Sequence, residues 1–236
     1  MSTKNSPGVV ESVNNGSDVK TGQIVLQATR SLVTLFVHIV VGVIVSVALL
    51  FGFRNGTPTN ATSTHVMICV IGYQLLMVEA ILALAPDSWL SSLKLQHRRL
   101  THLFMQVLGS VFALGGSYIK ILDKDNHWVS LHGQFALAAM VFTTVSLVNG
   151  LTSFYAYELR QVLPGTLSKL SHICFGVGAI LSANISLMYG FNKTVFSTWA
   201  PSLSETFIIL TSMLTVIIII NPLITFIQKF LGVFKK

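Results

Sequence analysis

Residues 129–150 read VSLHGQFALAAMVFTTVSLVNG, a stretch without Asp, Glu, Lys or Arg that carries one histidine, His132. An α-helix needs about 20 apolar residues to cross the hydrocarbon core of a bilayer. The apolar residues follow one another without the alternation of a strand, so a membrane barrel does not fit this stretch. The segment therefore predicts a transmembrane helix.

Five further windows have the same character, so the sequence predicts an all-α integral membrane protein with six transmembrane helices. These windows are Leu32–Phe53, Thr64–Ala85, Leu100–Leu122, Leu167–Gly190 and Leu203–Ile227. The composition agrees, because the 236 residues are 52% hydrophobic and only 10% charged, whereas soluble domains carry about 25% charged residues. An ordinary soluble enzyme and a nucleic-acid-binding module are thereby excluded.

The chain divides into three parts. Residues 1–31 are polar and rich in Ser, Asn and Gly, and we expect them to form a disordered cytosolic segment. Residues 32–228 form the membrane domain, and residues 229–236 form a basic tail. Cys69 and Cys174 fall near opposite membrane surfaces, so no disulfide is expected between them.

The distribution of positive charge predicts the orientation, because cytosolic loops carry an excess of Lys and Arg. Four cations belong to one side, namely Arg54, Lys120, Lys124 and Lys193. Eleven belong to the other: Lys4, Lys20, Arg30, Lys94, Arg98, Arg99, Arg160, Lys169, Lys229, Lys235 and Lys236. We expect the second side, with both termini, to face the cytosol. Glycosylation sequons at Asn60 and Asn192 fall in loops of the opposite, luminal side.

Four histidines share one position, near the start of a predicted helix. They are His65, His102, His132 and His172, in helices 2 to 5. Because successive helices run in opposite directions, depth in the membrane pairs His65 with His132 on the luminal side. The other two form a pair on the cytosolic side. Ionisable groups within a bilayer are costly and mark functional sites, although polar residues at helix ends also bind headgroups or neighbouring helices.

Two imidazoles that face each other across a four-helix core are what a six-coordinate haem iron needs. Gly133 directly follows His132, and Gly176 lies one turn beyond His172. Small residues at these places would let a flat ring approach the helix backbone. Zinc is the poorer interpretation, because a pair of histidines lacks the further ligands that a zinc site requires.

The segment from Thr64 to Gly190 resembles the cytochrome b561 family. The stretch Asn126–Gly133, NHWVSLHG, is similar to the family's luminal loop that leads into helix 4. The sequences QLLMVEA (residues 74–80), HGQ (132–134) and KLSH (169–172) resemble the branch called cytochrome b561 domain-containing protein 2. Helix 2 ends in ALAP (83–86), where the ascorbate-using branch that is better known carries an arginine.

The resemblance implies a protein whose helices 2 to 5 hold two haem b groups. Cytosolic ascorbate would donate an electron to the haem of His102 and His172. The electron would continue to the haem of His65 and His132, and then to luminal ferric iron or monodehydroascorbate. Such a protein would be an ascorbate-dependent transmembrane reductase. The family also suggests endoplasmic reticulum, endosomal or vesicle membranes, and homodimers.

Three further places are candidate sites. A basic cluster just before His102 comprises Lys94, His97, Arg98 and Arg99. It could bind the ascorbate anion or haem propionates. It is equally explained as a signal of membrane topology. His127 lies beside acidic residues in the luminal loop and would bind the acceptor or a proton, unless the loop is merely solvated. Glu79 lies deep in helix 2, where it could relay a proton, pair with Arg98 or Arg99, or bond a neighbouring helix. His38 in helix 1 is assigned no ligand role.

Two alternatives come from other functional classes. One is a non-redox transporter whose histidines carry protons or divalent metal, although no inverted repeat with broken helices is evident. The other is a membrane adaptor that acts through its Ser- and Asn-rich N-terminus. Haem content separates these alternatives from a redox protein, because a transporter and an adaptor would both purify colourless.

Overall fold

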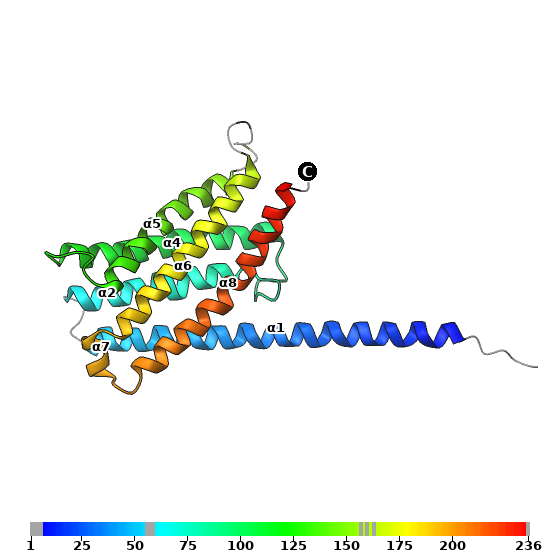
Figure 1. Ribbon diagram of the computed structural model, residues 1–236, viewed down its shortest axis with the longest axis horizontal. Helices are drawn as coiled ribbons and strands as arrows, with labels where there is room; N and C mark the ends of the chain where they lie inside the picture. Colours follow the sequence, from blue (N-terminus) through cyan, green and yellow to red (C-terminus); the bar gives the residue numbers. More distant parts are fainter. Residues whose placement is uncertain (1–6, 55–59, 156–157, 159–160, 162–163, 235–236) are drawn as a thin grey trace, which may run out of the picture.

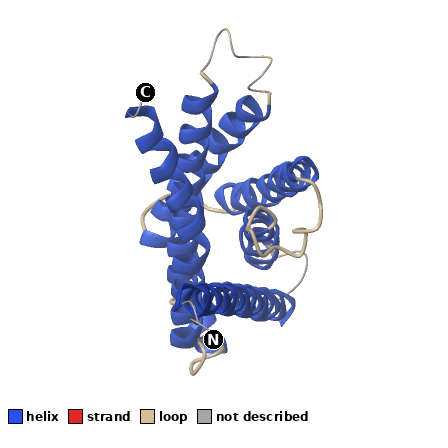
Figure 2. Ribbon diagram, turned by 90° about the vertical axis from the view of Figure 1, so that its right-hand side faces the viewer, coloured by secondary structure: helices blue, strands red, loops and turns tan. Residues whose placement is uncertain are grey.

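The computed structural model describes residues 7–54, 60–155, 158, 161 and 164–234, and within these ranges every regular element is a helix (Figure 2). Six helices in this part of the chain are long and apolar enough to cross a membrane. The prediction of an all-α, multi-pass membrane protein is therefore confirmed.

The chain crosses from one end of the bundle to the other in six passes. The second pass changes helix type along its length, from α2 through the π-helix η1 to α3, and the short helix α7 joins the last two passes. The elements are α1 (Pro7–Arg54), α2 (Ala61–Val70), η1 (Ile71–Met77), α3 (Val78–Leu82), α4 (Leu95–Leu122), α5 (Leu131–Phe154), α6 (Gly165–Phe191), α7 (Thr194–Trp199) and α8 (Ser204–Phe234).

Local sequence explains where two of the histidine-bearing helices begin. The side-chain oxygen of Asn60 accepts a hydrogen bond from the backbone N–H of Thr62 at 2.8 Å and caps α2. Ser130 caps α5 in the same way through the N–H of Gly133, at 3.4 Å. Each cap fixes the start of a helix that carries a histidine within its first five residues.

Helix α1 is much longer than its membrane window, and its N-terminal half extends beyond the other helices (Figure 1). It begins at Pro7, so over residues 7–31 the structure differs from the disordered segment that we expected. Proline is favoured at the first position of a helix. No further proline occurs before Arg54, so nothing in the sequence forces an early end.

The helices form a closed ring in chain order. The pass formed by α2, η1 and α3 packs between α1 and α4, α5 joins α4 to α6, and α8 returns from α6 to α1. Large aliphatic side chains fill the space around α1 and α8, with Val37, Val41, Ile44 and Leu214 fully buried. The inner positions of α4, α5 and α6 are instead small, mainly Gly, Ala and Ser.

Glycines bring the second pass unusually close to α4. A Cβ atom on Gly72 would lie 2.6 Å from the backbone nitrogen of Ala113 and 2.8 Å from the carbonyl oxygen of Gly109. Small residues allow such backbone contact between membrane helices. Only glycine fits at this crossing without movement of a helix.

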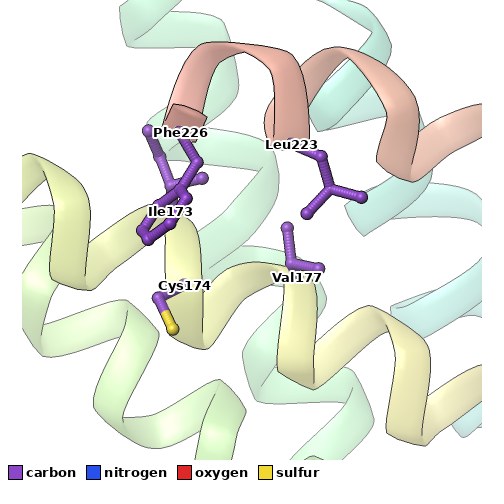
Figure 3. Close-up of a pocket in the computed structure, with 5 residues that line it drawn as sticks. All are labelled: Ile173, Cys174, Val177, Leu223 and Phe226. Carbon is purple, nitrogen blue, oxygen red and sulfur yellow. The ribbon is translucent and has the colours of Figure 1, made fainter. Parts of the chain in front are cut away.

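The outer surface where α6 meets α8 carries a small hollow. A small apolar pocket opens between them, lined by Ile173, Cys174, Val177, Leu223 and Phe226 (Figure 3). Cys174 is exposed at this surface, and neither it nor Cys69 forms a disulfide.

Candidate functional site

The four helix-start histidines meet in two pairs inside the ring. The imidazole ring centroids of His65 on α2 and His132 on α5 lie 6.1 Å apart, with their planes at 88°. Those of His102 on α4 and His172 on α6 are also 6.1 Å apart, at 90°. These are the two pairs that depth in the membrane predicts, and each one crosses the four-helix core diagonally.

Each imidazole also donates its Nδ1–H to a backbone carbonyl of a neighbouring helix. The bonds run from His65 to Gly116 (2.9 Å), from His102 to Ala80 (2.8 Å), from His132 to Ser186 (2.8 Å) and from His172 to Ser146 (2.9 Å). A carbonyl can only accept, so Nδ1 carries the proton and Nε2 is the nitrogen left to bind a metal. Such bonds orient metal-binding histidines and fix their tautomer.

The same bonds place the two pairs at a fixed separation along the helices. Each of three helices carries a histidine and, fourteen residues later, the carbonyl that serves the other pair: His102 and Gly116, His132 and Ser146, His172 and Ser186. Fourteen residues of α-helix span about 21 Å. The two pairs therefore lie near opposite surfaces of a hydrocarbon core about 30 Å thick.

The second pass needs fifteen residues for the same span, from His65 to Ala80. The extra residue is accommodated by η1, because a π-helix takes more residues per turn than an α-helix. The π segment thus keeps His65 and the carbonyl of Ala80 facing the core together.

The donor chemistry at each pair fits an axially ligated haem iron. A metal ion bonded to one nitrogen of each ring, at about 2.0–2.1 Å, leaves the ring centroids about 6 Å apart. A Cβ on Gly150 would lie 3.0 Å from Cε1 of His172, and one on Gly190 would lie 3.4 Å from Cε1 of His132. These glycines let the rings lie against the helix backbone. The described residues contain no cluster of three or more His, Cys, Asp or Glu that could hold a metal ion.

The family model of eukaryotic cytochrome b561 sequences matches residues 64–197, which is more than half of the chain. This range contains all four histidines. The chain belongs to the cytochrome b561 family. Membership implies a b-type haem and transmembrane electron transfer by an oxidoreductase.

Relatives of this cytochrome b561 include proteins named transmembrane reductase CYB561D2. The protein from Homo sapiens is 29% identical over 164 residues, which cover 67% of this chain and 73% of the relative. The one from Mus musculus is 29% identical over 187 residues, covering 77% and 80%. The one from Bos taurus is 27% identical over 209 residues, covering 86% and 92%.

The basic cluster of this cytochrome b561 surrounds the start of α4, two turns before His102. Lys94, His97 and Arg99 are exposed there. Arg98 is partly buried, and its guanidinium donates to the carbonyl oxygens of Ala83 at 3.0 Å and Ala85 at 2.6 Å. Arg98 therefore holds the end of the second pass against α4, which leaves the exposed residues of the cluster as the ones open to a solute.

At the other end, His127 is exposed in the loop before α5. Its ring lies 5.9 Å from that of Trp128, whose φ of 60° turns the chain sharply at this point. Nearby, Lys120 bonds Thr62 at 2.8 Å and Asp123 at 2.5 Å. The acidic residue closest to the membrane in this loop is thus already paired with a cation.

Glu79 has a partner that the sequence did not suggest. Its Oε1 atom lies 2.7 Å from Nδ1 of His38 on α1, whereas Arg98 bonds backbone carbonyls. Of the alternatives for Glu79, the bond to a neighbouring helix is therefore the one observed, and pairing with Arg98 is not, because that guanidinium bonds carbonyls of the turn after α3. A signal for His38 exists in the sequence, since Arg30, Thr34 and His38 recur every fourth residue and form a polar line on one face of an apolar helix.

Proposed function

We propose that this protein transfers electrons from cytosolic ascorbate to a luminal acceptor, ferric iron or monodehydroascorbate, with two b-type haems bound by its histidine pairs. The observation that carries the proposal is the pair of diagonal imidazole sites about 21 Å apart, each with its Nδ1 atoms tied to backbone carbonyls. Haem held by each histidine pair would supply an iron that can gain and lose one electron.

The protein's own residues hold and insulate this chemistry. His102 and His172 would bind the cytosolic-side haem, and His65 and His132 the luminal-side haem. Their bonds to carbonyls keep every Nε2 free and correctly oriented. The apolar helices around the pairs exclude water, so charge in the core is poorly screened. Histidines held in this way need little rearrangement when an electron is added to the site or removed from it.

The basic cluster is proposed to bind ascorbate. Lys94, His97 and Arg99 lie exposed at the N-terminus of α4, where cations and free backbone N–H groups attract an anion. Arg98 holds the start of α4 in place through its hydrogen bonds to the carbonyl oxygens of Ala83 and Ala85. At the luminal end, His127 is proposed to contact the acceptor. Glu79 is proposed to relay the proton that accompanies ascorbate oxidation.

The orientation and assembly belong to the same proposal. An even number of membrane passes would put both termini on one side, and the excess of Lys and Arg there favours the cytosol. We infer an endoplasmic reticulum, endosomal or vesicle membrane, and a homodimer.

The first test is an optical spectrum of the purified protein, oxidised and then reduced with ascorbate, with haem per chain quantified. We expect two b-type haems per chain and reduction by ascorbate. A colourless protein from haem-replete cells would overturn the proposal and favour the transporter hypothesis. Haem that dithionite reduces but ascorbate does not would reject the donor alone.

Replacing the exposed cations tests the ascorbate surface. The double variant Lys94→Gln, Arg99→Gln should raise the half-saturating ascorbate concentration by roughly tenfold, since each lost charge contact is worth up to about 1 kcal/mol. Added salt should shrink the difference, because exposed charges are screened. Lys193→Gln, an exposed cation at the opposite end, serves as the control. An unchanged half-saturating concentration in the double variant would place ascorbate elsewhere.

A further inference from the structure

A line of polar side chains runs from an open pocket toward the His102/His172 pair at the same end of the bundle. On α1, Arg30, Thr34 and His38 follow one another at intervals of one turn, over about 12 Å. Arg30 lines the pocket, whose walls also include Asp87 and Ser91. Thr34 donates to the carboxylate of Asp87. His38 contacts Glu79 deeper in the membrane.

The polar line ends at Glu79, which is one residue away from a backbone carbonyl that binds His102. Glu79 directly precedes Ala80, and the carbonyl of Ala80 accepts the Nδ1–H of His102 at 2.8 Å. Glu79 is the one carboxylate in the interior of a described membrane pass; Glu205 lies in the first turn of α8. The side chain of Glu79 is 16% exposed and that of His38 is 31% exposed.

We propose that His38 and Glu79 form a proton-accepting pair, and that Thr34 and Asp87 connect this pair with the cytosolic pocket. The proposal rests on the proposed function, because it concerns the charge that an electron brings to the His102/His172 site. His38 is thereby given a role that its position outside the four-helix core did not indicate.

The chemistry balances as follows. In the proposed resting state, Nδ1–H of a neutral His38 donates to Oε1 of a Glu79 carboxylate, so that the pair carries one negative charge. When the donor gives one electron to the neighbouring site, Nε2 of His38 takes one proton, and the pair becomes neutral overall. The proton is the one that ascorbate oxidation releases, and it reaches the pair through water in the pocket on the side of the donor. When the electron leaves for the luminal side, the proton returns to the pocket, so no proton crosses the membrane.

Electrostatics favours this coupling. An added negative charge in an apolar interior is poorly screened and is stabilised strongly by a nearby proton. The other ionisable groups around the pair have fixed partners or lie farther away. Arg98 on α4 bonds backbone carbonyls, His102 bonds Ala80, and Asp87 accepts from Thr34. Within described α8, the only charged residues are Glu205 and Lys229, near its two ends.

The test measures the midpoint potential of the His102/His172 haem against pH. In the unaltered protein the potential should fall with rising pH, with a slope approaching 59 mV per pH unit for one proton per electron. Glu79→Gln and His38→Gln should each flatten that slope. Thr29→Ala, an exposed position on α1 beside the polar line, should keep it. A purely structural contact between α1 and α3 would leave the slope unchanged in both variants.

Proton uptake gives an independent readout. Electrochemical reduction in unbuffered detergent solution, followed with a pH indicator, should remove close to one proton per electron at this site. Asp87→Asn should slow the uptake without changing its stoichiometry. Reduction of the unaltered protein without uptake overturns the proposal, even if the variants fail to fold. A protein without haem would instead reject the proposed function itself.

Discussion

We expect His102→Ala to lose one of the two proposed haems and, with it, the proposed reduction by ascorbate. The variant removes one ring nitrogen from the His102/His172 pair and leaves His172 without the imidazole whose ring centroid lies 6.1 Å from its own. Loss of residues that merely orient a ligand lowers metal affinity by about 10- to 100-fold, and loss of the ligand itself should cost more. Haem per chain should fall from two to one, and the rate of reduction by ascorbate should fall at least 100-fold.

The partner variants make this result specific. His172→Ala should empty the same site and give the same spectrum as His102→Ala. His65→Ala should keep the ascorbate-reducible haem but abolish ferric reduction on the luminal side. His127→Ala, which changes an exposed loop residue, should keep both haems. If His65→Ala and His102→Ala emptied one common site, the diagonal pairing would be wrong.

Among the glycines whose surroundings the structure describes, Gly72→Ala is expected to destabilise the bundle most. The new Cβ would lie 2.6 Å from the backbone nitrogen of Ala113, and a backbone atom cannot rotate away as a side chain can. Overpacking of this kind costs about 1–3 kcal/mol and occasionally more. Thermal unfolding of the detergent-solubilised protein, followed by loss of haem absorbance, should show a clear fall in the transition temperature.

Gly115→Ala provides the matched control, because a Cβ at that position meets nothing within 4 Å. Alanine favours helix by about 1 kcal/mol over glycine in solution, so this variant should be neutral or slightly more stable. Equal transition temperatures for Gly72→Ala and Gly115→Ala would contradict the tight crossing of the second pass and α4.

Much of the architecture could be predicted because long apolar windows and helix direction are local properties of the chain. The same two facts place His65 at the depth of His132, and the rings do lie side by side. Helix ends were less predictable, since α4 begins at Leu95, five residues before its apolar window. Polar residues can continue a helix beyond the membrane, so hydropathy alone does not mark its first turn.

The partners of individual side chains could not be predicted, because they depend on how helices rotate against one another. The sequence suggested an arginine or a neighbouring helix as the partner of Glu79, and the structure pairs it with His38 of α1, a helix outside the four-helix core. Likewise, the carbonyl acceptors of the four imidazoles are backbone atoms, which leave no trace in residue type. Their spacing of fourteen residues becomes visible only once the bonds are known.

Because it contains the π-helix η1, the second pass uses one residue more than the other core passes to cover the same distance between the two histidine pairs. One extra residue in a regular α-helix would rotate everything beyond it by about 100°. Between Ile71 and Met77 that rotation is absorbed locally. The four core passes are therefore equivalent in three dimensions but not in sequence. Any alignment of the second pass with α4, α5 or α6 must open a one-residue gap in η1, and an alignment without it would mismatch either His65 or Ala80.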